Sequence, residues 1–170
     1  HTEIIENVAQ QGGGILVDGD ANVRLTNATL EANRAVEGGG LLNRSVAELT
    51  NTTFSNNVAT DEGGGIKNAG ANAVLTVRNS TVYENEAARG GGILAESAQT
   101  TRVLNSIVAG NVAATGHDVS GDFEDQGHNL IGSAAGSSGF TNSIFVGTAA
   151  NPIDPRLAPL ADNGGPTRTH

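Results

Sequence analysis

Residues Asn51–Ile66 read Asn-Thr-Thr-Phe-Ser-Asn-Asn-Val-Ala-Thr-Asp-Glu-Gly-Gly-Gly-Ile, and this stretch is the unit in which the chain is written. An Asn is followed by a small residue, a Thr and an apolar residue. A second Asn comes six positions after the first, and a glycine triplet with an aliphatic residue closes the unit. The same skeleton starts again at Asn27, Asn79 and Asn105. The chain is therefore a tandem repeat, which restricts its fold to repeat architectures.

The glycine triplets set the period of the repeat. They begin at Gly12, Gly38, Gly63 and Gly90, in steps of 26, 25 and 27 residues. The apolar residues between them form short β-type runs, and a glycine in a helix interior costs about 1 kcal/mol relative to alanine. About 25 residues accommodate roughly three strands and three turns, one circuit of a parallel β-helix. We predict an all-β parallel β-helix (β-solenoid) of about five to six coils, with three short strands per coil.

Stacking of the coils predicts which side chains form the core. Equivalent residues of successive coils lie directly above one another, about 4.8 Å apart. Three aliphatic rows should point inward and contribute one layer per coil. These rows are Leu25, Leu49, Val77 and Val103; Leu30, Phe54, Val82 and Val108; and Ile15, Leu41, Ile66 and Ile93.

Two asparagine rows accompany the apolar rows. A buried carboxamide can donate to the copy on one side and accept from the copy on the other, which builds a ladder along the stack. Ligand binding is the alternative, but a binding site rarely repeats with every structural period. We therefore interpret both rows as structural ladders: Asn27, Asn51, Asn79 and Asn105, and Asn33, Asn57, Asn85 and Asn111. The turn glycines Gly12, Gly38, Gly63 and Gly90 suit corners that need positive φ or a close backbone approach.

Composition limits the classes of partner. The chain has 170 residues, 24 of them glycine, and only 3% aromatic residues, so one domain with a thin core is expected. A net charge of −9 disfavours binding to nucleic acid or to an anionic membrane. No apolar run is long enough to cross a bilayer, so we expect no nucleic-acid partner and no membrane insertion by this segment. The absence of cysteine excludes disulfides.

The repeat pattern also divides the single domain. Residues 1–125 should form the regular coils, the first of them truncated. Residues 126–170 should form an irregular last coil and a C-terminal capping segment, with the Pro-rich stretch from Asn151 wrapped over the end of the tube. Because the chain begins within a repeat and without Met, we interpret it as a fragment of a longer polypeptide.

Two polar stretches depart from the repeat. Asp18, Asp20 and Asn22 space three oxygen side chains two residues apart, as at the start of a calcium loop, and calcium is the one cofactor that the sequence suggests. The later Gly and bidentate Glu of such a loop are missing, which favours a solvated acidic turn. Near residue 117 a glycine triplet is replaced by Gly116-His117-Asp118, and an acidic loop with His128 follows. Its spacing matches no standard metal site, and a polar loop is the favoured interpretation.

Two sets of residues resemble known proteins. The Gly-Gly-Gly-Ile/Leu element combined with apolar-x-x-Asn resembles the repeats of polymorphic outer-membrane proteins and related bacterial surface β-helix proteins; the second element occurs at Leu30–Asn33, Phe54–Asn57, Val82–Asn85 and Val108–Asn111. Residues 154–170 resemble the C-terminal segment of choice-of-anchor Q surface proteins. The resemblance implies a right-handed single-stranded parallel β-helix, secretion, and a signal and an anchor outside this segment. It carries over no catalytic residue.

Three classes of function remain. We favour a non-enzymatic extracellular scaffold or adhesin on a bacterial surface, with a glycan or a host or cell-surface molecule as ligand. A carbohydrate-active β-helix, such as a lyase or hydrolase, is the alternative; Arg78, Arg102, Asp61 and Glu62 could be combined into its site, but nothing in the sequence singles them out. The third class is a surface- or ice-binding array on the Thr row Thr29, Thr53 and Thr81, which ends at Ile107. An uncovered first coil also predicts end-to-end self-association through Gly12–Ile15.

Overall fold

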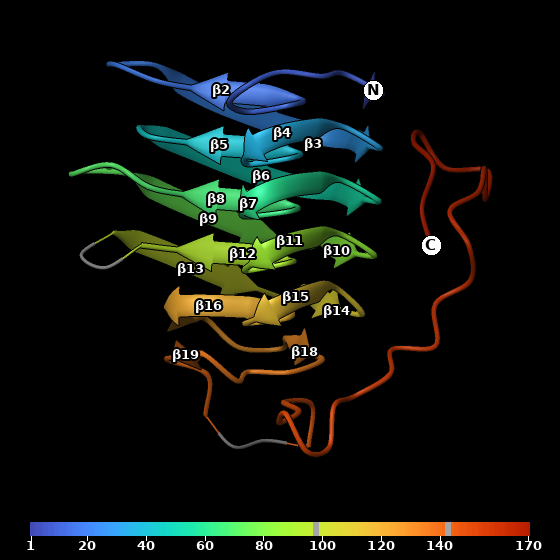
Figure 1. The fold of residues 1–170 in the computed structure, drawn as a ribbon. Helices are drawn as coiled ribbons and strands as arrows, with labels where there is room; N and C mark the ends of the chain where they lie inside the picture. Colours follow the sequence, from blue (N-terminus) through green and yellow to red (C-terminus); the bar gives the residue numbers. More distant parts are fainter. Residues whose placement is uncertain (97–98, 142–143) are drawn as a thin grey trace.

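The computed structural model describes residues 1–96, 99–141 and 144–170, and in these ranges the chain forms strands and turns without a helix. The chain winds into stacked coils, and strands of successive coils pair in parallel (Figure 1). The strands lie in three sheets of nine, four and six members. The predicted parallel β-helix is confirmed.

The nine-stranded sheet bends along the first asparagine row. Asn27, Asn51, Asn79 and Asn105 have φ values of 53°, 52°, 50° and 48°, a left-handed conformation that Asn adopts more readily than most residues. Strands β3 and β6 run through the bend, whereas in the next two coils the bend separates two strands, so these coils have four strands rather than three. The members of this sheet are β1 (Thr2–Ile5), β3 (Asn22–Glu31), β6 (Val46–Ser55), β9 (Val74–Arg78), β10 (Thr81–Tyr83), β13 (Thr100–Leu104), β14 (Ile107–Ala109), β17 (Glu124–Asp125) and β18 (Leu130–Ile131).

The glycine triplets connect the other two sheets. The four-stranded sheet contains β4 (Arg34–Glu37), β7 (Val58–Glu62), β11 (Glu86–Arg89) and β15 (Val112–Thr115). The six-stranded sheet contains β2 (Ile15–Val17), β5 (Leu41–Asn43), β8 (Ile66–Asn68), β12 (Ile93–Ala95), β16 (Val119–Asp122) and β19 (Ser137–Ser138).

The three positions of a triplet require glycine for different reasons. The first of each, Gly12, Gly38, Gly63 and Gly90, has φ between 59° and 69°, as the sequence predicted. The second and third lie against the next coil. A Cβ on Gly39 would lie 2.5 Å from the carbonyl oxygen of Gly64, which is backbone and cannot move aside. The triplet therefore turns the chain and then lets two coils approach closely.

The core is the set of rows that the repeat predicted. Leu30, Phe54, Val82 and Val108 stand in register, and all four are fully buried. The row through Leu41, Ile66 and Ile93 is also in register and buried, and the row through Leu49, Val77 and Val103 is likewise. Only the first-coil members Ile15 and Leu25 are partly buried, because fewer coils cover them.

The second asparagine row forms a continuous ladder inside the tube. Each Asn donates from Nδ2, and from its backbone N–H, to Oδ1 of the next rung at 2.9–3.1 Å, from Asn33 to Asn57, Asn85 and Asn111. Asn7 extends the ladder at one end. The first row is exposed or half-buried and pairs only locally, from Asn51 to Asn27 and from Asn105 to Asn79. The structural ladder is confirmed, and the buried row is its continuous form.

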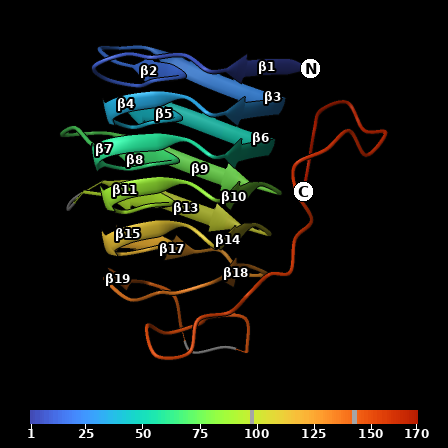
Figure 2. The same ribbon diagram turned by 45° about the vertical axis from the view of Figure 1, so that its right-hand side comes forward.

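The C-terminal segment does not lie where the sequence predicted. Residues 151–170, which we call the strap, leave the end of the tube and run back along its side toward the first coil (Figures 1 and 2). Its end contacts Glu3, Glu31 and Thr29. The strap covers the outer side of β1, β10, β14, β18 and the second halves of β3 and β6, which we call the lateral face. The predicted Thr row is in register, but Thr29 and Thr53 are buried and Thr81 is half-buried, so the row does not form an exposed array.

Candidate functional site

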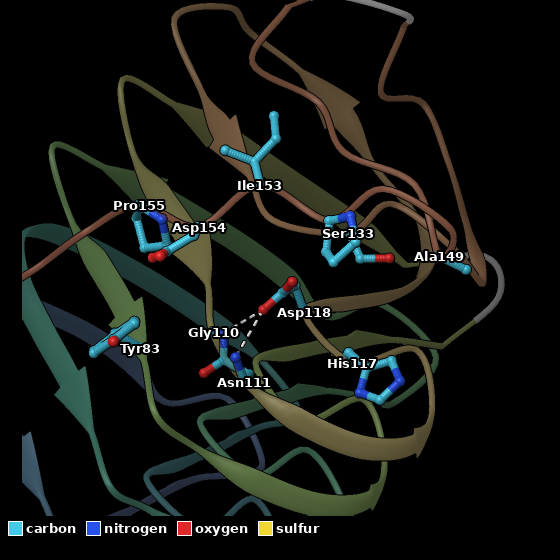
Figure 3. A pocket seen from close by; sticks show the side chains of 11 residues that line it. Tyr83, Gly110, Asn111, His117, Asp118, Ser133, Ala149, Ile153, Asp154 and Pro155 are labelled. Atoms are coloured by element: carbon cyan, nitrogen blue, oxygen red, sulfur yellow. Dashed lines mark hydrogen bonds between the residues drawn. The ribbon is translucent and has the colours of Figure 1, made fainter.

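The largest departure from the repeat produces a pocket between the last coils and the strap. This strap pocket has a volume of about 360 Å³. Its floor is Gly110, Asn111 and Asp118; its apolar wall is Ala149 and the strap residues Pro152, Ile153 and Pro155; its polar rim is Tyr83, His117, Ser133 and Asp154. Figure 3 shows Tyr83 and Asp154 toward one end of the pocket and His117 with Ser133 toward the other.

Asp118 in the floor ends the asparagine ladder. Its Oδ1 accepts the backbone N–H and the Nδ2 of Asn111, both at 2.9 Å, as the next Asn would (Figure 3). The backbone N–H of Ser133 also donates to this carboxylate. Burial raises the pKa of Asp118, and the hydrogen bonds from Asn111 and Ser133 offset this only in part. The carboxylate is therefore engaged in hydrogen bonds that hold the last coils together.

The rim carries the polar groups that the fold leaves available. The backbone N–H of Ala113 donates to Nδ1 of His117 at 3.4 Å, so Nε2 of this exposed ring faces outward as a donor. Asp154 accepts from the backbone N–H of Arg156 with one oxygen, and its other oxygen remains an acceptor. Burial and the charges of Glu84 and Asp154 raise the pKa of Tyr83, so its hydroxyl stays protonated at neutral pH. The pocket can thus offer donors and acceptors beside an apolar wall.

Gly110 explains how Tyr83 reaches the rim. A Cβ on Gly110 would lie 2.4 Å from the ring of Tyr83, so only glycine leaves room for the ring. His170 of the strap packs against the same ring edge to face, with the ring centroids 4.8 Å apart. The tyrosine is therefore held between the tube and the strap.

A second polar cluster surrounds the one lysine of the chain. Lys67 is buried, and its Nζ lies 2.6 Å from Glu62, 3.0 Å from Glu37 and 3.4 Å from Glu96. Burial by itself lowers the pKa of Lys67, but the hydrogen bonds and charges of Glu62 and Glu37 outweigh this effect and hold the pKa above its ordinary value. Lys67 lies in register between Leu42 and Leu94, so the carboxylates compensate a buried cation that is flanked by two leucines. The cluster is a structural feature of the coil corner.

The residues of the predicted calcium turn lie at the surface between β2 and β3. Asp18 accepts from the backbone N–H of Gly19 and lies 3.4 Å from Nη1 of Arg44, while Asp20 and Asn22 are exposed. A neighbouring guanidinium already supplies positive charge to Asp18. Across the described ranges, no three His, Cys, Asp or Glu side chains gather as metal ligands do. The calcium site at Asp18, Asp20 and Asn22 stays a prediction.

The hypothetical catalytic set is distributed over two sheets. Arg78 and Arg102 lie on β9 and β13, whereas Asp61 and Glu62 lie on β7 of the four-stranded sheet. Glu62 pairs with Lys67 and Arg89, and Arg102 pairs with Glu124. These four residues do not form one site.

Sequence reasoning missed two features of the polar interior. One is a third ladder, in which Asn43 donates to Asn68 at 2.8 Å and Asn68 donates to Thr101. The spacing of 25 residues between Asn43 and Asn68 was its signal. The other is the strap pocket, whose residues His117 and Asp118 stood out only as a break in the pattern. Its strap wall had no signal, because no periodicity relates residues 152–155 to the coils.

The fold and these sites define a parallel β-solenoid whose asparagine ladder is structural and whose strap pocket brings several singular polar groups together. Residues 2–154 match the family described as "Right handed beta helix region", which covers most of the chain. The chain belongs to this family, and its coils are right-handed. Comparison with curated proteins and with solved structures found no match. Among the described residues, no helix is long and apolar enough to span a membrane.

Proposed function

We propose that this β-helix is a non-enzymatic extracellular scaffold or adhesin of a bacterial surface or secreted protein. The observation that supports it best is the state of Asp118. This is the buried carboxylate of the strap pocket, and its Oδ1 accepts two hydrogen bonds from the ladder. Oδ1 of this carboxylate is engaged in holding the last coil together, which supports a structural role for Asp118. The pocket then presents groups for binding rather than for bond cleavage.

The same proposal includes an extracellular or cell-surface location for the protein. The glycine-triplet repeats and the segment 154–170 resemble surface β-helix proteins, which supports an extracellular or cell-surface location with the anchor and the signal outside this segment. The net charge of −9 favours a partner other than nucleic acid. A glycan or another cell-surface molecule fits the rim of hydroxyl, imidazole and carboxylate groups beside an apolar wall.

Weak end-to-end association also belongs to this proposal. Strand β2 is the terminal strand of the six-stranded sheet, so its outer edge carries backbone groups that can pair with another chain. Light scattering over a concentration series tests this idea. The mass should grow with concentration, and Ile4→Lys should abolish the growth; a constant monomer mass would contradict it.

A carbohydrate-active enzyme is the second candidate, and one observation favours it. The strap pocket combines two carboxylates, Asp118 and Asp154, with the imidazole of His117. Enzymes that cleave glycosidic bonds use carboxyl groups as acid, base or nucleophile. With Asp118 engaged by the ladder, Asp154 and His117 would have to act alone.

One experiment separates the two candidates. The protein is incubated with a panel of insoluble polysaccharides, and both the retained protein and the released reducing ends are measured. The scaffold proposal expects retention without release. Release that increases with time and is lost in Asp154→Asn and His117→Ala would establish the enzyme instead. Retention by none of the glycans, with no release, would remove the glycan as ligand.

A further inference from the structure

The strap ends in a docking site that holds an arginine. Arg168 forms ion pairs with Glu31 and, at 3.2 Å, with Glu3, two carboxylates on adjacent strands of the first coils. The hydroxyl of Thr29 donates to the backbone carbonyl of Arg168 at 3.0 Å. Thr167, beside it, is buried. A guanidinium fits two carboxylates better than an ammonium does, because its donors lie in a fixed planar fork.

His170 provides a second anchor two residues further on. Its Nε2 lies 2.9 Å from the hydroxyl of Ser55, and its Nδ1 lies 2.9 Å from the carbonyl oxygen of Ala158. Its ring packs edge to face on Tyr83. Together, Glu3, Glu31, Thr29, Ser55 and Tyr83 form what we call the receptor surface, and the segment Arg168–His170 is its occupant.

The middle of the strap is attached weakly. In the part of the chain that the structure describes, backbone hydrogen bonds join the strap to the tube only where the N–H of Ile153 donates to Gly132. Ala161 and Thr169 then pair with each other in an antiparallel bridge. The strap is thus fixed at its two ends and could be released by breaking a few side-chain contacts.

The connection between these ends is longer than the rise that it spans, so it can reach a neighbouring molecule. The lateral face rises by five strand steps from β18 to β1, which is about 24 Å at about 4.8 Å per step. The fifteen residues from Ile153 to Arg168, which contacts β1 and β3, reach about 46 Å when extended. Within this stretch Arg156 has φ of 53°, an unfavourable conformation for a long side chain. Backbone strain in a connecting segment favours its exchange between copies.

We propose that the receptor surface is a recognition site for the Arg168–His170 segment of a second copy of this chain, so that two molecules exchange straps. All contacts of the closed molecule are kept in the exchanged pair. The chain's own strap competes at an effective concentration on the order of millimolar, so the unmodified protein exchanges only when crowded. Disabling the competing strap should reveal the exchange at lower concentration.

Two full-length variants test the proposal by complementation. Arg168→Glu keeps the receptor surface and disables the strap, whereas Glu3→Gln combined with Glu31→Gln keeps the strap and disables the receptor surface. Each variant alone should stay monomeric in analytical ultracentrifugation. Their equimolar mixture should contain a heterodimer with one strap docked, formed at a protein concentration at least about tenfold below that at which the unmodified protein dimerises. A mixture that stays monomeric up to millimolar concentration would overturn the proposal.

A peptide assay keeps the proposal testable if either variant fails to fold. A labelled peptide of residues 161–170 is titrated into a full-length chain that carries Arg168→Gln and His170→Ala. Binding should be at least about tenfold tighter than to the unmodified protein and at least about tenfold weaker for a peptide with Arg168→Gln. Equal binding of the two peptides would contradict arginine recognition. Ile4→Lys, which targets end-to-end stacking, should leave the binding unchanged.

Discussion

The regular coils and the strap use polar side chains in opposite ways. In the coils, the asparagine ladder repeats, and each member hydrogen-bonds its copy one coil away, as Asn57 does with Asn33 and Asn85. In the strap, each contact occurs once and joins residues far apart in sequence. Arg168 and Glu31, for example, are 137 positions apart.

This difference shows where function is to be sought in a repeat protein. A repeated polar residue is satisfied by the repeat itself, so it builds the tube and has little left to offer a ligand. A singular polar residue has no copy to pair with; Lys67 pairs with carboxylates inside the coils, whereas other singular residues lie where the repeat ends. His117, Asp154 and Arg168 are of this kind, and all three lie at the strap or at the pocket that it helps to form.

The largest effect is expected from a charge in a repeated apolar row. Val82 is fully buried between Phe54 and Val108, so Val82→Asp places an unpaired carboxylate in the core. We expect a loss of more than about 4 kcal/mol in the free energy of unfolding, measured by chemical denaturation. Glu84→Asp, at an exposed position in the same coil, is the control and should leave stability unchanged. Equal stability of both variants would refute the inward assignment of this row.

A smaller but still large effect is expected from breaking the ladder. Asn57→Ala removes the acceptor of Asn33 and the donor to Asn85 and Leu30, all buried. Since an unsatisfied buried group costs about 1–3 kcal/mol, we expect a loss of about 3 kcal/mol. The matched control is Asn56→Gly, because Asn56 is exposed and has φ of 56°, where alanine would add strain. If Asn56→Gly lowers the free energy of unfolding more than Asn57→Ala does, the ladder is not what stabilises the coil.

The sequence was sufficient to predict the features that recur from coil to coil. Residues such as Leu30 and Phe54 must lie above one another once the period is known, so the core rows and the ladder through Asn33 could be predicted. The bend at Asn51 is also local, but the sequence did not show that it would separate strands such as β9 and β10 in later coils. Strand ends depend on small backbone differences between coils, which composition does not encode.

The strap lay beyond sequence reasoning for a physical reason. Its anchors pair single residues across the whole chain, as Arg168 does with Glu3 at a separation of 165 positions. Arg168 belongs to no periodic row, and Glu3 only occupies the register position of Thr29, so many alternative partners were equally compatible with the sequence. The acidic character of the first coils offered several carboxylates, and only the three-dimensional path of the strap selects Glu3 and Glu31. The pocket depends on that path and could not be predicted either.

The smallest effect concerns Asp118, where the repeated ladder meets the singular pocket, and it appears as a pH dependence. Because burial raises the pKa of Asp118 above its ordinary value of 3.8, the folded protein holds this proton more tightly than the unfolded chain. The contribution of Asp118 to stability is therefore greatest below that ordinary value and decreases as the pH rises through the raised pKa. Glu62 has the opposite sign, since the hydrogen bond from Lys67, which outweighs burial, lowers its pKa; its contribution is lost as the pH falls.

Asp118→Asn isolates this effect, because Asn keeps an acceptor for Asn111 and carries no charge. The stability difference between Asp118→Asn and the unmodified protein should shift in favour of the variant as the pH rises from about 4 to 7. Asp118→Ala, which leaves the N–H and Nδ2 of Asn111 without an acceptor, should cost about 1–3 kcal/mol over the same range. Thermal denaturation of the three proteins at several pH values measures both. A difference between Asp118→Asn and the unmodified protein that does not change with pH would show that Asp118 does not titrate with folding, and the ladder would then end on a carboxylate at no electrostatic cost.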